Sequence, residues 1–172
     1  MDQTDRTLIE KYIRSHDEAT FRDLYRRHTP ALYALALRLS GAEADAQDAV
    51  QDVWTRACAT FSRFNWDSSL RTWLTGILIN CTREQRRKRR NKEEPLLDDV
   101  NHTVPATAGE RLGLEQAIEQ LADGYRYVLT LHDVEGYTHE EISSMLDISV
   151  GTSKSQLHHA RKTMRALMGE TK

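Results

Sequence analysis

Apolar residues recur along most of the chain at the three- and four-residue spacing of amphipathic helices. In the first half of the sequence this spacing predicts four helical stretches, at residues 21–28, 30–39, 43–57 and from 70 onward. Pro30 begins the second stretch, because proline fits the first turn of a new helix, and Gly41 ends it. The spacing therefore predicts an all-α fold for this half of the chain.

The same spacing returns in the second half and predicts two short helices followed by a helix-turn-helix. Gly136 ends the second short helix. Thr138 and Glu141 have the spacing of a capping box, in which the hydroxyl and the carboxylate bind backbone donors at the start of a helix. The last helix, from Val150, carries hydroxyl, imidazole and basic side chains on its polar side. We expect it to be the second helix of the helix-turn-helix.

Residues 93–110 separate the two helical parts and show neither helical nor strand spacing. They contain two prolines, five acidic residues and no basic residue, which is typical of an exposed linker. We therefore predict two small helical domains, at residues 1–92 and 112–172, joined by a flexible acidic linker at 93–111.

Composition narrows the class of protein. Apolar residues make up 39% of the chain and charged residues 29%, too apolar for a disordered chain and too charged for a membrane protein. No apolar run approaches the roughly 20 residues of a membrane span, and the first residues lack the pattern of a signal sequence. We expect a cytoplasmic protein without direct membrane insertion. Residues 1–92 hold 17 Lys and Arg against 12 Asp and Glu, and the remainder 7 against 14, so the two halves offer opposite charge.

The sequence contains little that suggests catalysis. Cys58 and Cys81 fall in apolar helical patterns, which favours small buried side chains over a disulfide or a metal site. Asp45, Asp48 and Asp52 follow one side of a helix, and clustered carboxylates can bind magnesium in a nuclease. No histidine, lysine or nucleophile motif supports them. We expect no enzyme, no catalytic residue, no metal and no cofactor.

Three stretches have the chemistry of nucleic-acid contact. Residues 83–92 contain seven Lys or Arg, which attract any polyanion, although a solvated helix end has the same composition. Phe61, Phe64 and Trp66 lie upstream, and unpaired bases stack on aromatic faces. Trp73 belongs to an apolar stripe, and we expect it in the core. The polar side of the last helix suits either the DNA major groove or plain solvent.

Several segments together resemble the extracytoplasmic-function sigma factors of the sigma-70 superfamily. The most specific are DAQDAVQDVWTRA at 45–57, LRTWLTGILINCTREQRRKRR at 70–90 and LTLHDVEGYTHEEISSMLDISVGTSKSQLHHARKTMRAL at 129–167. The resemblance covers residues 17–170 and extends to the order and separation of these segments. It implies a sigma factor that binds core RNA polymerase and directs promoter recognition and transcription initiation. The alternative is a stand-alone helix-turn-helix regulator, which leaves the first domain and the linker unexplained.

The resemblance implies binding residues for each part of the promoter complex. Docking on the clamp helices of the polymerase β′ subunit is implied for Asp45, Asp48, Gln51, Asp52 and Thr55. Binding and opening of the minus-ten element is implied for Phe61, Phe64, Asn65, Trp66, Asn80, Arg83, Arg86 and Arg87. Recognition of the minus-thirty-five duplex is implied for Thr152, Lys154, Ser155, Gln156, His158, His159 and Arg161.

The resemblance also divides the work within these sets. Phe64 and Asn80 match the residues that hold a flipped minus-ten base, one by stacking on it and the other by reading an edge. On the last helix, Thr152, Gln156 and Arg161 match backbone contacts and the other four residues match base contacts. The polymerase β flap and an anti-sigma factor are further implied partners, and the linker is implied to occupy the polymerase cleft.

The sequence departs from the family at a few of these positions. Gly76 stands where a long polar or basic residue is usual, and Ser153 replaces the usual valine on the buried face of the last helix. Gln156 and His159 stand where arginines are usual. We therefore expect reduced affinity for the minus-thirty-five element.

Overall fold

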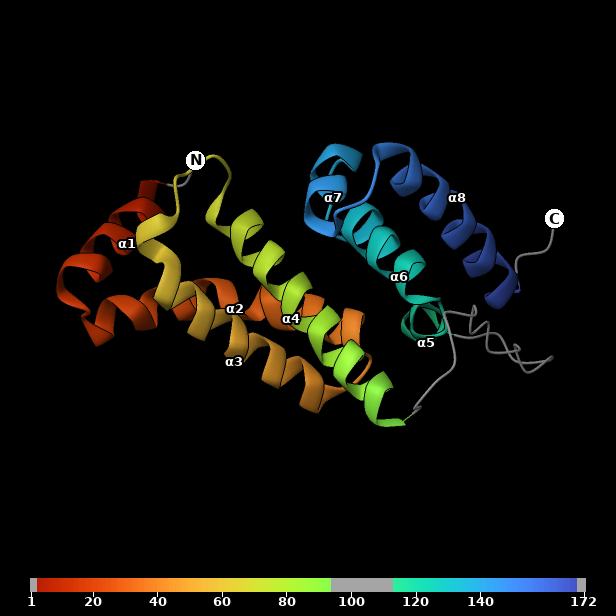
Figure 1. Cartoon of the computed structure of the whole chain (residues 1–172), viewed down its shortest axis with the longest axis horizontal. Coiled ribbons are helices and arrows are strands. Elements are labelled where there is room, and N and C mark those ends of the chain that lie inside the picture. The colour runs from red at the N-terminus through yellow and green to blue at the C-terminus, as the bar shows by residue number, and fades with distance from the viewer. Residues whose placement is uncertain (1–2, 94–112, 170–172) are drawn as a thin grey trace. The chain divides into compact units, whose positions relative to one another are not determined.

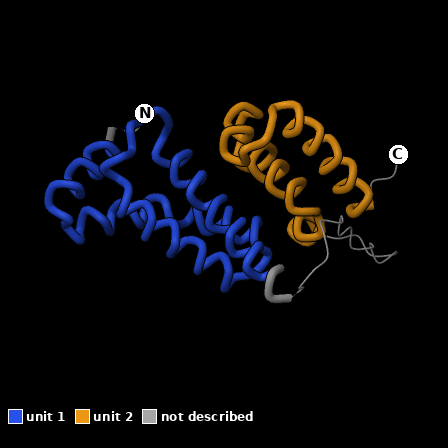
Figure 2. The backbone as a smooth tube through the Cα atoms, viewed as in Figure 1, with its two compact units in different colours: residues 1–91 blue, residues 92–172 orange. Residues whose placement is uncertain are grey.

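Helices form every regular element in the described parts of the chain (Figure 1). The computed structural model describes residues 3–93 and 113–169, with side chains described from 4 to 89 and from 113 to 169. The chain divides into two units, residues 1–91 and 92–172 (Figure 2). The predicted acidic linker lies outside the described residues, apart from the backbone of Glu93. The predicted all-α fold is confirmed.

The first unit is built around two long helices that pack against each other, α2 and α3. Its described elements are α1 (Gln3–Ser15), α2 (Glu18–Ser40), α3 (Glu43–Thr60), the 3-10 turn η1 (Phe61–Arg63) and α4 (Leu70–Glu93). Arg56 on α3 and Glu84 on α4 form a two-bond ion pair with N–O distances of 2.9 and 2.7 Å. The core of this unit includes Leu35, Leu39, Ala49, Val53, Leu74 and Leu78.

Pro30 does not begin a new helix, so the predicted division at this residue is wrong. α2 runs through Pro30 without interruption. A proline inside a helix removes one backbone hydrogen bond and crowds the preceding turn, but the flanking turns are held from outside. Leu24 and Leu32 are buried on either side of it, and the indole nitrogen of Trp54 donates to the Thr29 hydroxyl at 2.9 Å. Contacts with α3 therefore preserve a helix that the local sequence alone would divide.

The second unit contains four short or medium helices and one wider turn within the described residues. They are α5 (Leu114–Glu119), α6 (Asp123–Leu129), the π-helical turn η2 (Thr130–Val134), α7 (His139–Leu146) and α8 (Val150–Leu167). Arg126 is 6% exposed. Its guanidinium donates to the carbonyl oxygens of Ile118 at 3.1 Å and Leu121 at 2.9 Å. These bonds tie the Arg126 side chain to the backbone between α5 and α6, and they fix the corner between the two helices.

The helix-turn-helix forms as predicted. The Thr138 hydroxyl accepts from the Glu141 backbone nitrogen at 3.2 Å, and the Glu141 carboxylate accepts from the Thr138 backbone nitrogen at 2.9 Å. The predicted capping box is therefore confirmed. Asp147 ends α7 in the left-handed conformation with φ of 55°. The Ser149 hydroxyl then caps α8 by accepting from the Thr152 backbone nitrogen at 2.9 Å.

Candidate polymerase and nucleic-acid interfaces

The acidic residues predicted to dock on polymerase lie together on α3. Asp48, Gln51, Asp52 and Thr55 are all exposed, at the three- and four-residue spacing that places side chains on one helix face. Asp45 differs from them, because it is half-buried and forms an ion pair with Arg89 of α4. Four of the five predicted residues thus form one open polar face, and the fifth helps to join α3 to α4.

An aromatic groove that the sequence did not predict lies beside this acidic face. It encloses about 540 Å³ and includes Gln51 and Thr55 in its lining. Its aromatic side chains come from α2 and α3. They are Phe21, Tyr25 and Tyr33 of α2 and Trp54 of α3. Tyr25 is 41% exposed, Phe21 and Tyr33 are half-buried, and Trp54 is buried. Spacing along α2 could not reveal the groove, because it forms only when α3 packs alongside.

The aromatic residues of the loop after α3 are less open than predicted. Phe61 is 2% exposed and Phe64 is 7% exposed. The Phe64 ring stacks on Trp73 with a centroid distance of 4.8 Å and an interplanar angle of 26°. Asn65 is exposed and Trp66 is half-buried. Phe61 and Phe64 therefore support the loop from inside, and the two residues that follow Phe64 are more open to solvent.

Asn80 is exposed on α4 and lines a second hollow of about 490 Å³. Trp73, Ile77 and Arg63 share in its lining, whereas Phe64 does not. Trp73 was expected in the core, but it is only half-buried, because one part of its ring packs on Phe64 and another part meets the hollow. The two residues matched to the flipped base are therefore connected through Trp73, for which the sequence had predicted a place in the core.

Basic residues continue the line of Asn80 along α4. Arg83 and Arg87 are exposed, and Arg86 is half-buried. The spacing from Asn80 to Arg83 and on to Arg87 is three and then four residues, so these side chains lie on one face of the helix. The side chains of residues 90–92, the rest of the basic stretch, lie outside the described residues. The described part provides a strip of positive charge leading from the hollow.

The predicted DNA-reading residues of α8 divide into two groups. Lys154, Ser155 and His158 are exposed. His159 is exposed as well, but its ring stacks on Tyr125 of α6 at 5.9 Å. The side chain of Gln156 packs closely against the backbone of Gly124. The first three residues are thus open to a partner, whereas the two residues that replace arginines make contacts with α6. Thr152 is half-buried and belongs to the cap of α8.

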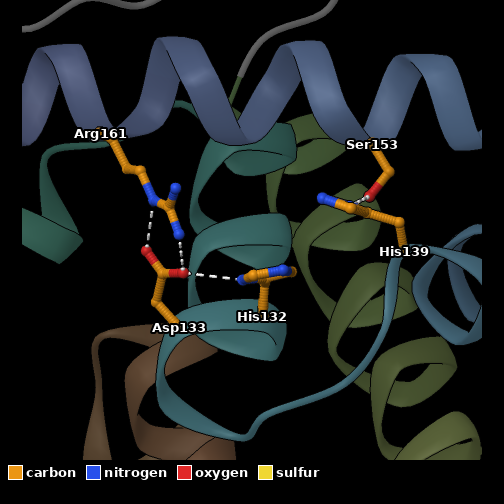
Figure 3. A network of polar contacts seen from close by, with 5 residues as sticks. All are labelled: His132, Asp133, His139, Ser153 and Arg161. Carbon is orange, nitrogen blue, oxygen red and sulfur yellow. Dashed lines mark hydrogen bonds and ion pairs between the residues drawn. The ribbon is translucent and has the colours of Figure 1, made fainter.

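Arg161 is held by an acidic partner (Figure 3). Its Nε and Nη2 atoms donate to the two carboxylate oxygens of Asp133 at 2.9 and 2.6 Å. The Nδ1 atom of His132 lies 2.8 Å from the same carboxylate. These bonds, chiefly those from Arg161, lower the pKa of Asp133 below its ordinary range. Helical spacing could not reveal this ion pair, because Asp133 and Arg161 are 28 positions apart.

Ser153 has a hydrogen-bonding partner in the same region (Figure 3). Its side chain is fully buried, and its hydroxyl lies 2.9 Å from Nδ1 of His139. The His139 ring stacks on His132 at 4.6 Å. Partial burial is the main cause that lowers the pKa of His139, and the charges of His132 and Lys154 add to it. The histidine therefore accounts for a serine at a position where the family usually has valine.

Neither a metal site nor a membrane span is found in the described ranges. Within residues 3–93 and 113–169, no cluster of three or more His, Cys, Asp or Glu side chains is arranged to hold a metal ion. No helix there combines the length and the apolarity needed to cross a bilayer. Cys58 and Cys81 are both free thiols, and burial raises the pKa of Cys81 to about 11.

Comparison with known proteins identifies the family. The description "Sigma-70 region 2" matches residues 24–92, and "Sigma-70, region 4" matches residues 111–164. The sequence is 33% identical over 144 residues to the ECF RNA polymerase sigma factor EcfG of Rhodopseudomonas palustris, covering 81% of this chain and 80% of that protein. The chain belongs to the extracytoplasmic-function sigma factors. This sigma factor is also 28% identical over 170 residues to SigM of Mycobacterium tuberculosis, covering 98% of this chain and 86% of that one.

Two solved structures share the fold of this chain. The sigma factor RpoE of Bartonella quintana, in complex with the anti-sigma factor NepR, matches with a TM-score of 0.71 and 29% identity over 88% of this chain and 98% of that one. CnrH, in complex with the cytosolic domain of CnrY, matches with a TM-score of 0.68 over 99% and 100% of the two chains. At 23% identity, this second likeness concerns the fold alone.

Family membership establishes the general function. The chain is a sigma factor that directs promoter recognition by RNA polymerase in transcription initiation. The alternative of a stand-alone regulator is not favoured, because the region-2 match accounts for the first unit. No catalytic family is among the matches that identify the chain.

Proposed function

We propose that this sigma factor divides promoter recognition between its two domains. The domain at residues 1–92 docks on core RNA polymerase and opens the minus-ten element, and the domain at 112–172 reads the minus-thirty-five element as a duplex. The observation that carries this proposal is that the two matched regions fold as separate units, and that each exposes the side chains its task requires. The acidic segment between them is proposed to run through the polymerase cleft.

The docking surface is the polar face of α3 with its neighbouring groove. Asp48 and Asp52 supply negative charge for a basic partner such as the β′ clamp helices, and Gln51 and Thr55 lie where this face meets the aromatic groove. The combination of an apolar groove and a charged rim is typical of specific protein interfaces. Asp45 is proposed to contribute indirectly, through its ion pair with Arg89.

Opening of the minus-ten element is assigned to the loop 61–69 and to α4. The hollow beside Asn80 provides a polar amide and the partly open Trp73 ring, which suits a base that has left its stack. Arg83, Arg86 and Arg87 would bind the phosphates of the same strand. Asn65 and Trp66 form the outer surface of the loop, and Phe61 and Phe64 support it from below.

Reading of the minus-thirty-five element is assigned to the exposed side of α8. Lys154, Ser155 and His158 are open to base edges in the major groove. His159 and Gln156 contact α6 in the free protein, and their binding to DNA would require them to exchange these contacts. Thr152 and Arg161 are proposed to contact phosphates near the start and the middle of the helix.

The proposal also covers further binding partners and the cellular location of the protein. The sigma factor RpoE of Bartonella quintana was solved in complex with the anti-sigma factor NepR, which supports an anti-sigma factor as a partner of this chain. The β flap of polymerase is the proposed partner of the second domain. As a factor that acts on DNA and polymerase, the protein is expected to work in the cytoplasm, without a catalytic residue or a cofactor.

The proposal is tested by transcription in vitro. Core RNA polymerase with and without the protein would be given a pool of promoter fragments, and the transcripts would be sequenced. New transcripts with fixed start sites, appearing only when the protein is present, are the expected result. If core polymerase is bound but no fragment is transcribed, promoter recognition by this chain is contradicted.

A further inference from the structure

The first helix, α1, precedes the region-2 match, which begins at residue 24, yet it has a fixed place in the first unit. Asp5 is 6% exposed. Its carboxylate accepts from Nη1 of Arg27 at 3.2 Å and lies 3.0 Å from Nε2 of His28. Ile9 is 1% exposed against the same unit. A buried carboxylate that loses its partners is strongly destabilising, so α1 is anchored to α2 by polar and apolar contacts together.

From this anchored position, α1 contacts the aromatic loop at two points. The Tyr12 ring meets Phe61 edge-on at 5.8 Å, with an interplanar angle of 80°. The guanidinium carbon of Arg6 lies 5.7 Å from the centre of the Trp66 ring, which is within the range of a cation–π contact. One helix therefore touches the beginning of the loop and also its outer surface.

Trp66 is the residue of the loop that most needs such support. Its φ is 65°. Residues other than glycine rarely adopt this left-handed conformation, and bulky residues least of all. The Phe64 ring lies 4.5 Å from Trp66, and the Arg6 guanidinium adds a second contact. Phe64 in turn stacks on Trp73 at 4.8 Å, and Trp73 lines the hollow beside Asn80. Contacts thus run without a gap from α1 to the hollow.

We propose that α1 is a working part of promoter opening, with Arg6 as a positioning residue. Arg6 holds Trp66, and through Phe64 and Trp73 this contact keeps the hollow in the shape that receives a base. The inference rests on the proposed function, in which the hollow takes a minus-ten base. It adds a segment outside the matched region to the opening machinery, and it gives a role to a residue that touches neither polymerase nor DNA in this scheme.

The first test uses the free protein and needs no promoter. Chymotrypsin cleaves after exposed aromatic residues, so the rate of cleavage after Trp66 reports how firmly the loop is held. We expect Arg6→Gln to raise this rate by about two- to fivefold, the factor that an exposed cation–π contact supports, and Arg6→Lys to restore most of the protection. Arg14→Gln is the matched control, because Arg14 lies on the same helix, pairs with Glu10 at 3.8 Å and has no ring contact with the loop.

The second test measures opening by the polymerase holoenzyme on a promoter that it transcribes. Permanganate reactivity of the minus-ten thymines should develop about two- to fivefold more slowly with Arg6→Gln, while affinity for core polymerase stays unchanged. The Arg6→Lys and Arg14→Gln variants should open at nearly the wild-type rate. In a Trp66→Leu background, Arg6→Gln should not slow opening any further, because Arg6 acts through the Trp66 ring.

The outcomes separate the inference from the function on which it rests. Faster cleavage with an unchanged rate of opening would show that Arg6 holds the loop for stability alone, and would overturn the proposal. An equal loss from Arg6→Gln with and without Trp66 would also overturn it, since Arg6 would then act by another route. A wild-type holoenzyme that opens no promoter would contradict both the proposed function and the inference.

Discussion

The buried hydroxyl of Ser153 shows how one polar residue is tolerated in the packed face of α8. A buried hydroxyl without a partner costs free energy, and here the imidazole of His139 supplies the partner at 2.9 Å. The arrangement links α7 to α8 in the helix-turn-helix. The imidazole in this hydrogen bond is neutral, because burial lowers the pKa of His139. Stability of this unit should therefore respond to pH.

We predict that the second unit loses stability as the pH falls below 6.5, the ordinary pKa of histidine. The folded pKa of His139 is below this value, so the unfolded chain binds the proton first. The contribution of neutral His139 to the stability of the folded unit is complete above pH 6.5, and it is lost as the pH falls through the folded pKa. Urea unfolding of the full chain, followed by circular dichroism at pH 7.5 and 5.5, measures it. The pH effect should shrink with His139→Phe combined with Ser153→Val, and should persist with His158→Gln.

A second prediction at this scale separates Lys154 from Arg161. Lys154→Ala should cost about 1 to 3 kcal/mol of binding and relax preference at one position of the minus-thirty-five element. Arg161→Ala should weaken binding to all sequences alike. It should also reduce the slope of log affinity against log salt concentration by about one. Binding titrations against a library of minus-thirty-five variants at several salt concentrations provide the comparison. If both variants lost the same affinity for every sequence, Lys154 would not be a residue that reads the base sequence.

At the scale of single elements, α3 combines two separate tasks. One side packs against α2 with small residues, since Ala46, Ala49 and Ala57 are all fully buried. The opposite side exposes Asp48 and Asp52. Substitutions on the exposed side should therefore change binding without disturbing the core.

We predict that Asp48→Lys together with Asp52→Lys weakens binding to core polymerase by roughly tenfold or more, because like charges would face a basic partner. Affinity can be measured by titrating labelled sigma factor with core enzyme, and circular dichroism checks that the helices remain. Glu18→Lys with Asp23→Lys is the charge-matched control on the exposed start of α2. Similar losses in both pairs would show that net charge, and not the face of α3, determines affinity.

The loop and α4 give a prediction about the hollow. Asn80→Ala should slow promoter opening but leave minus-thirty-five binding unchanged, because Asn80 is exposed and lines only the hollow. Phe64→Ala is a poorer test, since removing a buried phenylalanine typically costs about 3 to 5 kcal/mol of stability. Permanganate footprinting measures opening. Full reactivity of the minus-ten thymines with Asn80→Ala would contradict the assignment.

For the molecule as a whole, the sequence predicted those features that depend on neighbours along the chain. Helical spacing, the capping box at Thr138 and the pairing of α7 with α8 are local, and they were found as predicted. Features made by distant residues were not predicted. The groove needs rings from α2 and α3, the partner of Arg161 is 28 positions away, and Pro30 is overruled by packing. Periodicity shows which face a residue occupies, but it does not show what lies opposite.

The buried guanidinium of Arg126 has a consequence for how the second unit would come apart. An arginine stays protonated at any pH at which the protein works, so its bonds to the end of α5 do not change on acidification. The imidazole of His139 does take up a proton there. Acid should therefore loosen the joint between α7 and α8 first, while the corner between α5 and α6 keeps its shape. At mildly acidic pH the contact between α7 and α8 would weaken while the corner between α5 and α6 keeps its bonds, and α8 would stay packed through its buried residues Leu157, Ala160 and Met164.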